Sequence, residues 1–264
     1  PDDGQDVETL NTNADRAMYS AKGAGGDGFS CYCAELGEMA KDRLELEQHL
    51  AAALDNGQLC LYYQPQYNLK TRKLVALEAL LRWKHPERGL LRPDRFLDLA
   101  EDSGEGPKIG SWVLETACRQ IRFLADTGCG PVRIAVNVSP RQFLRPGFED
   151  TVVAAVRNHR IRPGLLELDL SESLVMKDFR RSRQRIDALR KFGVRVTLDD
   201  FGTGGASLSE LQALSVDSLK IDSSFIHTLG GNPRSSEFIE SIVRLARSLG
   251  VCAAAEGVET IPQL

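Results

Sequence analysis

Acidic side chains, one amide and one lysine recur in this sequence at or just beyond the ends of short apolar runs. These residues are Glu78, Asn137, Asp169, Asp199, Asp200, Lys220, Asp222 and Glu256. The spacings are 59, 32, 30, 21 and 36 residues along the series Glu78, Asn137, Asp169, Asp199, Lys220 and Glu256. Steps near 30 residues match one strand–helix repeat, and 59 is close to two. Because the strands of a parallel barrel end on one face, we expect these side chains to converge on one site.

This set of residue types favours metal chemistry. The five carboxylates of Glu78, Asp169, Asp199, Asp200 and Glu256 would repel one another strongly in a small volume unless a cation lay among them. Oxygen ligands without histidine or cysteine suit Mg²⁺, Mn²⁺ or Ca²⁺ rather than zinc. The adjacent pair Asp199-Asp200 allows one carboxylate to bridge two ions while its neighbour binds the second, an arrangement used to hydrolyse phosphodiesters. Lys220 would then lie near the attacking water or a phosphate oxygen.

Each of these residues also has a purely structural interpretation. A single Asp or Glu at a strand end commonly caps a helix or pairs with a basic side chain, and Asp199-Asp200-Phe201-Gly202 alone could be a turn. Six such positions at the spacing of the repeat favour a shared site over six separate caps.

After residue 56, apolar runs alternate with helical patterns. The predicted strands are Leu59–Gln66, Leu74–Leu81, Val132–Val138, Leu165–Leu170, Val194–Leu198, Val216–Ile221 and Val251–Ala255. The polar stretch Asn68–Lys73 predicts a hairpin between the first two strands, and helices are predicted at 108–126, 148–159, 178–192 and 235–249. Repeated strand–helix units predict a parallel sheet covered by helices, and seven strands suit a (βα) barrel. A doubly wound sheet would need a glycine-rich phosphate loop after its first strand, and the sequence has none there.

The first 56 residues differ in character from the rest. A short helix is predicted within Asn13–Lys22, stopped by Gly23, Gly25 and Gly26, with a short strand at Phe29–Cys33. A polar helical pattern follows, with Leu46, Leu50 and Leu54 four residues apart, and ends at Asn56-Gly57. We therefore expect an N-terminal piece over 1–34, a linker helix over 35–56 and a barrel domain over 57–264.

Composition narrows the functional classes. The 264 residues carry a formal net charge of −4, which does not favour a protein that coats nucleic acid. The sequence contains no apolar run long enough to cross a bilayer and no secretory signal, so we expect a cytoplasmic protein. Its six cysteines lack C-x-x-C spacing, and Cys60, Cys118 and Cys252 are expected to be small buried hydrophobes. The opening Pro1 without a Met indicates a piece of a longer protein.

The segment Glu78-Ala79-Leu80, within Leu77–Trp83, resembles the signature of the EAL domain family of bacterial phosphodiesterases, which linearise cyclic di-GMP to 5′-pGpG. The resemblance covers roughly residues 40–264. It is carried by these further motifs in order: Tyr62–Gln66, His85–Glu87, Asn137–Ser139, Asp199–Gly204, Lys220–Asp222 and Ala255–Thr260.

The resemblance implies an α/β fold, a modified (βα)8 TIM-type barrel whose first strand is antiparallel to the rest. It implies two Mg²⁺ or Mn²⁺ ions, with Ca²⁺ inhibitory. The first ion would be held by Glu78, Asn137, Asp169 and Asp199, and the second by Asp199, Asp200 and Glu256. It also implies a catalytic role for Lys220 on the attacking water, together with Glu78 and Glu256. Substrate would be contacted by Gln64, Arg82, Asp222 and Glu259, with the Arg82 guanidinium on a phosphate.

The same resemblance implies that Glu172 anchors the loop after the paired aspartates and that a homodimer forms through the loop around Asp200–Ser207. Three departures stand out. Asp169 replaces the usual Glu and is one methylene shorter. Gly205-Ala206-Ser207 replaces a commoner Tyr-Ser-Ser, and the chain ends at Leu264, before the last βα unit of the expected barrel.

The stretch Ala14–Lys22 resembles the last helix of a GGDEF (diguanylate cyclase-type) domain, which implies a GGDEF–EAL signalling protein with further sensor domains. Gly25-Gly26-Asp27-Gly28-Phe29 imitates the cyclase signature but follows this helix instead of preceding it. We interpret it as a coincidence and expect no cyclase activity from this chain.

Two alternatives to a cyclic di-GMP phosphodiesterase stay open. One is a catalytically inactive EAL domain that binds cyclic di-GMP and signals by a change of shape, for which Asp169 is the main argument. The other is an unrelated barrel enzyme acting on another phosphodiester, which the context of Gln64-Pro65 and Arg82 disfavours.

Overall fold

The computed structural model describes residues 6–23, 28–229 and 233–264 of the chain. The described residues form two compact units. The first comprises Pro1–Leu59 and Trp83–Glu105, and the second comprises Cys60–Arg82 and Gly106–Leu264. The second unit contains every residue of the predicted site.

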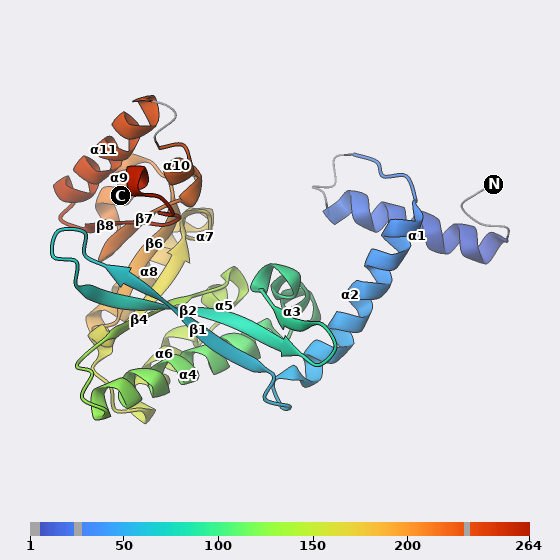
Figure 1. Cartoon of the computed structure of the whole chain (residues 1–264), viewed down its shortest axis with the longest axis horizontal. Coiled ribbons are helices and arrows are strands. Elements are labelled where there is room, and N and C mark those ends of the chain that lie inside the picture. The colour runs from blue at the N-terminus through green and yellow to red at the C-terminus, as the bar shows by residue number, and fades with distance from the viewer. Residues whose placement is uncertain (1–5, 24–27, 230–232) are drawn as a thin grey trace. The chain divides into compact units, whose positions relative to one another are not determined.

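A curled sheet forms the second unit (Figure 1). Its strand order is β1-β2-β4-β5-β6-β7-β8. The strands are β1 (Leu59–Tyr67), β2 (Leu74–His85), β4 (Arg133–Asn137), β5 (Leu166–Ser171), β6 (Arg195–Phe201), β7 (Ser218–Ile221) and β8 (Cys252–Ala255). From β2 to β8 all neighbours on this path are parallel. β1 runs against β2 in a hairpin, as Figure 1 shows, which confirms the predicted antiparallel first strand.

Amphipathic helices cover the outer face of this sheet. They are α4 (Gly106–Asp126), α6 (Phe148–Asn158), α8 (Phe179–Phe192) and α11 (Pro233–Ser248). α4 packs on β4, α8 on β6, and α11 on β7 and β8. On α4 the buried residues Ile109, Val113, Ala117 and Ile121 recur every fourth position, so one stripe faces the sheet and the rest faces solvent.

On strand β5, the side chains that point to either face of the sheet are buried. Leu166, Leu168 and Leu170 alternate with Glu167 and Asp169, and all five are buried. Since side chains alternate across a strand, the leucines pack under the helices while the two acids point into the concave side. The inner face of β5 therefore has acidic side chains where an ordinary hydrophobic core would have apolar ones.

The first unit is built around two helices and an edge hairpin. It contains α1 (Val7–Gly23), α2 (Ala34–Ala53), the end of β2, β3 (Gly89–Leu91) and α3 (Leu97–Ser103), and β2 pairs with β3 antiparallel. Leu46, Leu50 and Ala53 of α2 are buried. Arg88 pairs with Asp42 and, at 3.0 Å, with Glu45 of α2. These contacts attach α2 to the hairpin.

Short elements complete the fold. The helices of one or two turns are α5 (Pro140–Leu144), α7 (Glu172–Lys177), α9 (Leu208–Ala213) and α10 (Ser223–His227), with single 3₁₀ turns at Pro93–Arg95, Pro163–Leu165 and Ile261–Gln263. Among the described residues, no helix has the length and apolar character needed to cross a membrane.

The structure confirms the seven predicted strands, which are β1, β2 and β4 to β8, and the long helices, and it corrects two expectations. Phe29–Cys33 forms no strand in the described chain, since a strand needs a partner to hydrogen-bond and Phe29 is 90% exposed. Cys252, on the last strand of the described sheet, is exposed and Cys60 is only half-buried, whereas Cys118 is buried as expected. β3 and the short helices were not predicted, because they span too few residues to show a period. Gly25, Gly26 and Asp27 lie outside the described residues.

We expect Leu168→Ala to lower the free energy of unfolding by about 2–5 kcal/mol, because it leaves a cavity between β5 and the covering helices. Phe123→Ala on α4, where the side chain is 58% exposed, should change it by no more than about 0.5 kcal/mol. Urea denaturation of both variants measures the difference. Equal effects would contradict the packing described here.

We expect the stability of the first unit to fall at acid pH, when His85 becomes protonated. Its Nε2 lies 2.8 Å from Nδ1 of His49, and its Nδ1 accepts from the backbone N–H groups of Glu87 and Arg88. Burial, then the charges of His49 and Arg88, lower the pKa of His85, so the folded unit favours the neutral ring. This stability is present above the unfolded pKa near 6.5 and is lost as pH falls below it. Urea denaturation between about pH 5 and 8 should show a steeper acid loss in the parent than in His85→Gln, and parallel curves would contradict this.

Candidate functional site

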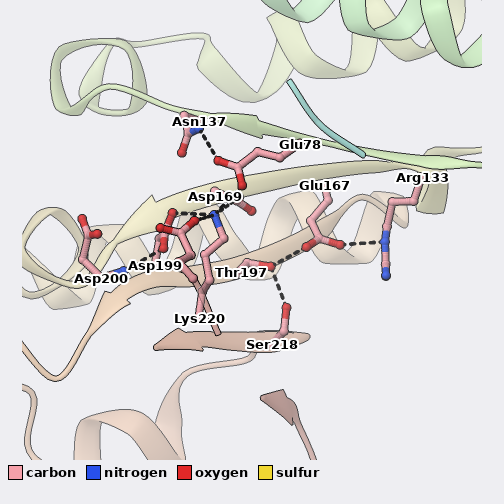
Figure 2. A network of polar contacts seen from close by, with 11 residues as sticks. Glu78, Arg133, Asn137, Glu167, Asp169, Thr197, Asp199, Asp200, Ser218 and Lys220 are labelled. Carbon is pink, nitrogen blue, oxygen red and sulfur yellow. Dashed lines mark hydrogen bonds and ion pairs between the residues drawn. The ribbon is translucent and has the colours of Figure 1, made fainter. Parts of the chain in front are cut away.

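The ammonium group of Lys220 lies at the centre of a carboxylate cluster (Figure 2). Its Nζ is 3.2 Å from Glu78 Oε2, 3.0 Å from Asp169 Oδ2 and 3.0 Å from Asp199 Oδ2. The Glu256 Oε1 atom lies 2.6 Å away. Four carboxylates, contributed by four segments spread over 179 positions of the sequence from 78 to 256, thus share one cation.

Parallel pairing explains this convergence. Asp169 on β5, Asp199 on β6 and Lys220 on β7 lie near the carboxyl ends of adjacent strands, and Glu256 directly follows β8. Glu78 is the exception, since β2 continues seven residues past it to His85, so its position within the strand was predicted wrongly. It still faces the site because its neighbour strand β4 ends at Asn137, whose Nδ2 donates to Glu78 Oε1 at 2.9 Å.

Burial controls the charges of the cluster. The side chain of Asp169 is fully buried and that of Lys220 is 3% exposed. Burial raises the pKa of Asp169 to about 8, with the Lys220 charge opposing the shift. Burial by itself disfavours the Lys220 ammonium, but the carboxylates of Asp169, Asp199 and Glu78 outweigh it and raise the pKa of this lysine. Lys220 is therefore held as an ammonium.

The donor set suits a hard cation in type. All the acidic groups and Asn137 offer oxygen, and Asp169 Oδ1 is buried without a hydrogen-bond partner among the described residues. As the side chains stand, no three acidic, histidine or cysteine groups in the described chain are disposed to hold one metal ion. The carboxylates are oriented toward the Lys220 ammonium, so metal binding would require some of them to turn away from it.

The paired aspartates point in different directions. Asp199 contacts Lys220, whereas Asp200 makes no hydrogen bond or ion pair with it in the described part of the chain (Figure 2). Asp200 has a φ of 54°, and the β6–β7 register shifts between Leu198 and Phe201. The left-handed conformation of Asp200 interrupts the alternation of side chains between the two faces of β6. The carboxylates of Asp199 and Asp200 can therefore both lie near the carboxyl end of the strand. Burial, then the charge of Asp199, raises the pKa of Asp200.

Glu172 holds the loop that follows these aspartates. Its Oε2 accepts from the backbone N–H of Gly202 at 2.9 Å and of Gly204 at 3.3 Å, and its Oε1 accepts from that of Ala206 at 3.0 Å. A Cβ on Gly204 would lie 2.7 Å from the Glu172 carboxyl carbon, so only glycine allows this close approach. The carboxylate of Glu172 thus replaces backbone partners for three loop amides.

In the described part of the chain, the four residues expected to contact substrate make no hydrogen bond or ion pair with the Lys220 cluster. Gln64 and Glu259 are exposed. Arg82 donates to the Leu81 carbonyl at 2.7 Å and stacks 5.8 Å from the Tyr62 ring centroid. Asp222 caps α10 and accepts from the Ser224 hydroxyl and, at 2.9 Å, from the Ser224 backbone N–H. The hydrogen bond from the hydroxyl, followed by that from the backbone, lowers the pKa of Asp222. In this structure Asp222 therefore has the capping role that the sequence left open.

Comparison with known proteins decides the family. A model of the EAL domain matches residues 47–264, most of the chain. The chain belongs to the EAL family. The motif Glu78-Ala79-Leu80 lies on β2, with Glu78 in the carboxylate cluster.

Its EAL relatives include multidomain signalling proteins. The bifunctional diguanylate cyclase/cyclic di-GMP phosphodiesterase MucR of Pseudomonas aeruginosa is 41% identical over 263 residues, which is 100% of this chain and 38% of that protein. The cyclic di-GMP phosphodiesterase NbdA of the same organism is 38% identical over 264 residues, 34% of its length. This chain thus spans little more than a third of these relatives.

Solved structures support the same EAL assignment. The structure described as the PaMucR phosphodiesterase in complex with c-di-GMP superposes with a TM-score of 0.81 at 42% identity. The match covers 83% of this chain and 89% of that one. The curled sheet and its helices are therefore those of an EAL barrel.

The EAL barrel also contains a polar layer that the sequence analysis missed. Below the carboxylate cluster, Glu167, Thr197, Ser218 and Arg133 contact one another inside the sheet (Figure 2). A signal was present in the sequence. Glu167, Thr197 and Ser218 each precede a cluster residue by two positions, which is the period that places both on one face of a strand.

Glu172→Gln should release the loop after the paired aspartates. Hydrogen bonds to a charged acceptor contribute about 1.5–3 kcal/mol, so the amides of Gly202, Gly204 and Ala206 should exchange about 10 to 100 times faster. Hydrogen–deuterium exchange followed by mass spectrometry measures this. Glu240→Gln on the exposed face of α11 is the control and should leave the exchange unchanged. Unchanged protection in the Glu172 variant would contradict the anchoring role.

Proposed function

We propose that this chain hydrolyses cyclic di-GMP to linear 5′-pGpG with the help of two divalent metal ions, Mg²⁺ or Mn²⁺. The observation that carries the proposal is the convergence of Glu78, Asp169, Asp199 and Glu256 on one point at the strand ends of an EAL barrel. Relatives named as cyclic di-GMP phosphodiesterases support the substrate, and the enzymes of this family depend on metals.

The acidic residues and Asn137 provide two sets of metal ligands in this proposal. Glu78, Asn137, Asp169 and Asp199 would hold one ion, and Asp199, Asp200 and Glu256 the other. When bound, the ions would lower the pKa of the attacking water and neutralise charge on the phosphodiester. The buried, unpartnered Asp169 Oδ1 supports a ligand role for Asp169 in spite of its short side chain.

Lys220 would orient the attacking water. Its ammonium group donates hydrogen bonds and lies among the acidic residues that would bind the ions, which suits it to hold a water there.

The substrate would be held by residues outside the cluster. Arg82 would contact a phosphate, because a guanidinium forms paired hydrogen bonds with phosphate oxygens. Gln64 and Glu259 would contact the remainder of the nucleotide. Asp222 would also contact substrate, from the N-terminus of α10 that it caps.

The wider assembly is part of the same proposal. The chain would dimerise through the loop around Asp200–Ser207, and GGDEF and sensor domains would precede it in a cytoplasmic signalling arrangement. The full-length protein would be anchored in a membrane only through parts outside this chain. Gly205→Asp, which places a charge at an exposed loop position where a Cβ would meet no atom within 4 Å, would test the dimer when followed by light scattering.

Chromatography of cyclic di-GMP after incubation in Mg²⁺, Mn²⁺ or Ca²⁺ tests the activity. We expect 5′-pGpG with Mg²⁺ or Mn²⁺ and not with Ca²⁺. Glu78→Ala should lower kcat/KM by about a hundredfold or more, since it removes a ligand and a Lys220 partner. Glu240→Ala is the control, because this side chain on α11 is exposed and pairs with Arg244 instead of Lys220.

Two results would overturn the enzymatic proposal. One is a Glu78→Ala variant that hydrolyses as fast as the parent. The other is tight binding of intact cyclic di-GMP in every metal, which would establish the alternative of a non-catalytic receptor.

A further inference from the structure

A hydrogen-bonded chain crosses three adjacent strands directly below the carboxylate cluster. Thr197 Oγ1 on β6 lies 2.7 Å from Glu167 Oε1 on β5 and 2.6 Å from Ser218 Oγ on β7. Glu167 and Thr197 are 5% and 2% exposed. We call Glu167, Thr197 and Ser218 the lower layer.

The direction of these hydrogen bonds is fixed by chemistry. A carboxylate only accepts, so the Thr197 hydroxyl donates its single proton to Glu167. The Ser218 hydroxyl must then donate to Thr197. Each hydroxyl therefore has one defined role, and the three side chains are held in a single arrangement.

Two arginines form ion pairs with the carboxylate of Glu167. Arg133 Nε on β4 lies 2.9 Å from Glu167 Oε2, and Arg195 Nε lies 3.8 Å from the same oxygen. Without these arginines, Glu167 would add a buried acidic group with no cationic partner beside the acids around Lys220. The arginines contact Glu167 Oε2, which leaves Oε1 to accept from Thr197.

Each member of the lower layer lies two residues before a cluster residue on the same strand. Glu167 precedes Asp169, Thr197 precedes Asp199, and Ser218 precedes Lys220 (Figure 2). In the sheet Thr197 is opposite Ser218 on one side and Asp169 on the other. If one strand shifted along its neighbour, the hydrogen bonds of the lower layer would break. Asp169, Asp199 and Lys220 would move apart at the same time.

We infer that Thr197 is a positioning residue for the proposed phosphodiesterase site, fixing the spacing of Asp169, Asp199 and Lys220 so that the acids can share metal ions. This inference rests on the proposed function. In this proposal Thr197 itself contacts neither substrate nor metal.

Thr197→Val tests it, because valine keeps the shape of threonine and removes the hydroxyl. The Mn²⁺ dissociation constant, followed by electron paramagnetic resonance, should rise about 10 to 100-fold, as for other residues that orient metal ligands. The kcat at saturating Mn²⁺ should fall while KM for cyclic di-GMP changes by less than about twofold, since Thr197 acts on the reacting site only. Thr197→Ser should restore Mn²⁺ affinity, because serine keeps the donor.

Two controls separate positioning from general destabilisation. Ser182→Ala removes a buried hydroxyl that has no hydrogen-bond partner in the described chain, and Leu189→Ala removes a buried side chain on the same helix, α8. Both should leave Mn²⁺ affinity at the parent value even where the melting temperature falls. If Thr197→Val does not fold, Ser218→Ala should show the same direction of change with a smaller size.

The possible outcomes are distinct. Parent-like Mn²⁺ affinity in a folded Thr197→Val or Ser218→Ala would overturn the positioning role alone. Equal loss of affinity in Leu189→Ala would also overturn it. A parent that binds Mn²⁺ but leaves cyclic di-GMP intact refutes the proposed hydrolysis and leaves the affinity test of Thr197 valid. A parent that binds no Mn²⁺ would overturn both.

Discussion

The buried ammonium of Lys220 is the constraint around which the inner face of this barrel is arranged. Four carboxylates from separate strands would repel one another in a region of low polarity, and each would lose hydration on folding. One lysine that contacts all four makes their approach possible. The same crowding keeps Lys220 charged and raises the pKa of Asp169, so the cluster holds few charges that are free of a partner.

The rest of the second unit serves this arrangement. The outward leucines of β5 pack under helices, which leaves its inward positions for Glu167 and Asp169. Two polar layers then stack inside the sheet, with the hydroxyls of Thr197 and Ser218 below and the acids with Lys220 above. A buried polar network is favourable only when its members are satisfied. Among the described residues, Asp169 Oδ1 in the upper layer and Glu167 Oε2, Arg133 Nε and Arg195 Nε in the lower one have no hydrogen-bond partner, although Glu167 forms ion pairs with both arginines.

Loop geometry adds what the regular strands do not provide. Asp200 adopts a left-handed conformation at the end of β6, and Glu172 accepts three backbone hydrogen bonds from the loop beyond it. The glycine at position 204 is required because the carboxylate approaches the backbone so closely. Asp199 and Asp200, which we propose as metal ligands, are therefore adjacent to the loop that Glu172 holds.

The sequence by itself determined the class of fold and the identity of the acidic set. Periodicity of two in the strands and near four in the helices is a local property, so the order of elements could be predicted, and repeat spacing indicated that Glu78, Asn137, Asp169, Asp199, Lys220 and Glu256 share a face. Tertiary structure decided which atoms meet. That Lys220 is the centre of the cluster, that Asp200 turns away from it, that Asp222 caps a helix, and that Thr197 joins Glu167 to Ser218 all depend on strand register and backbone conformation. Those are set by packing between residues far apart in the chain, and no local pattern encodes them.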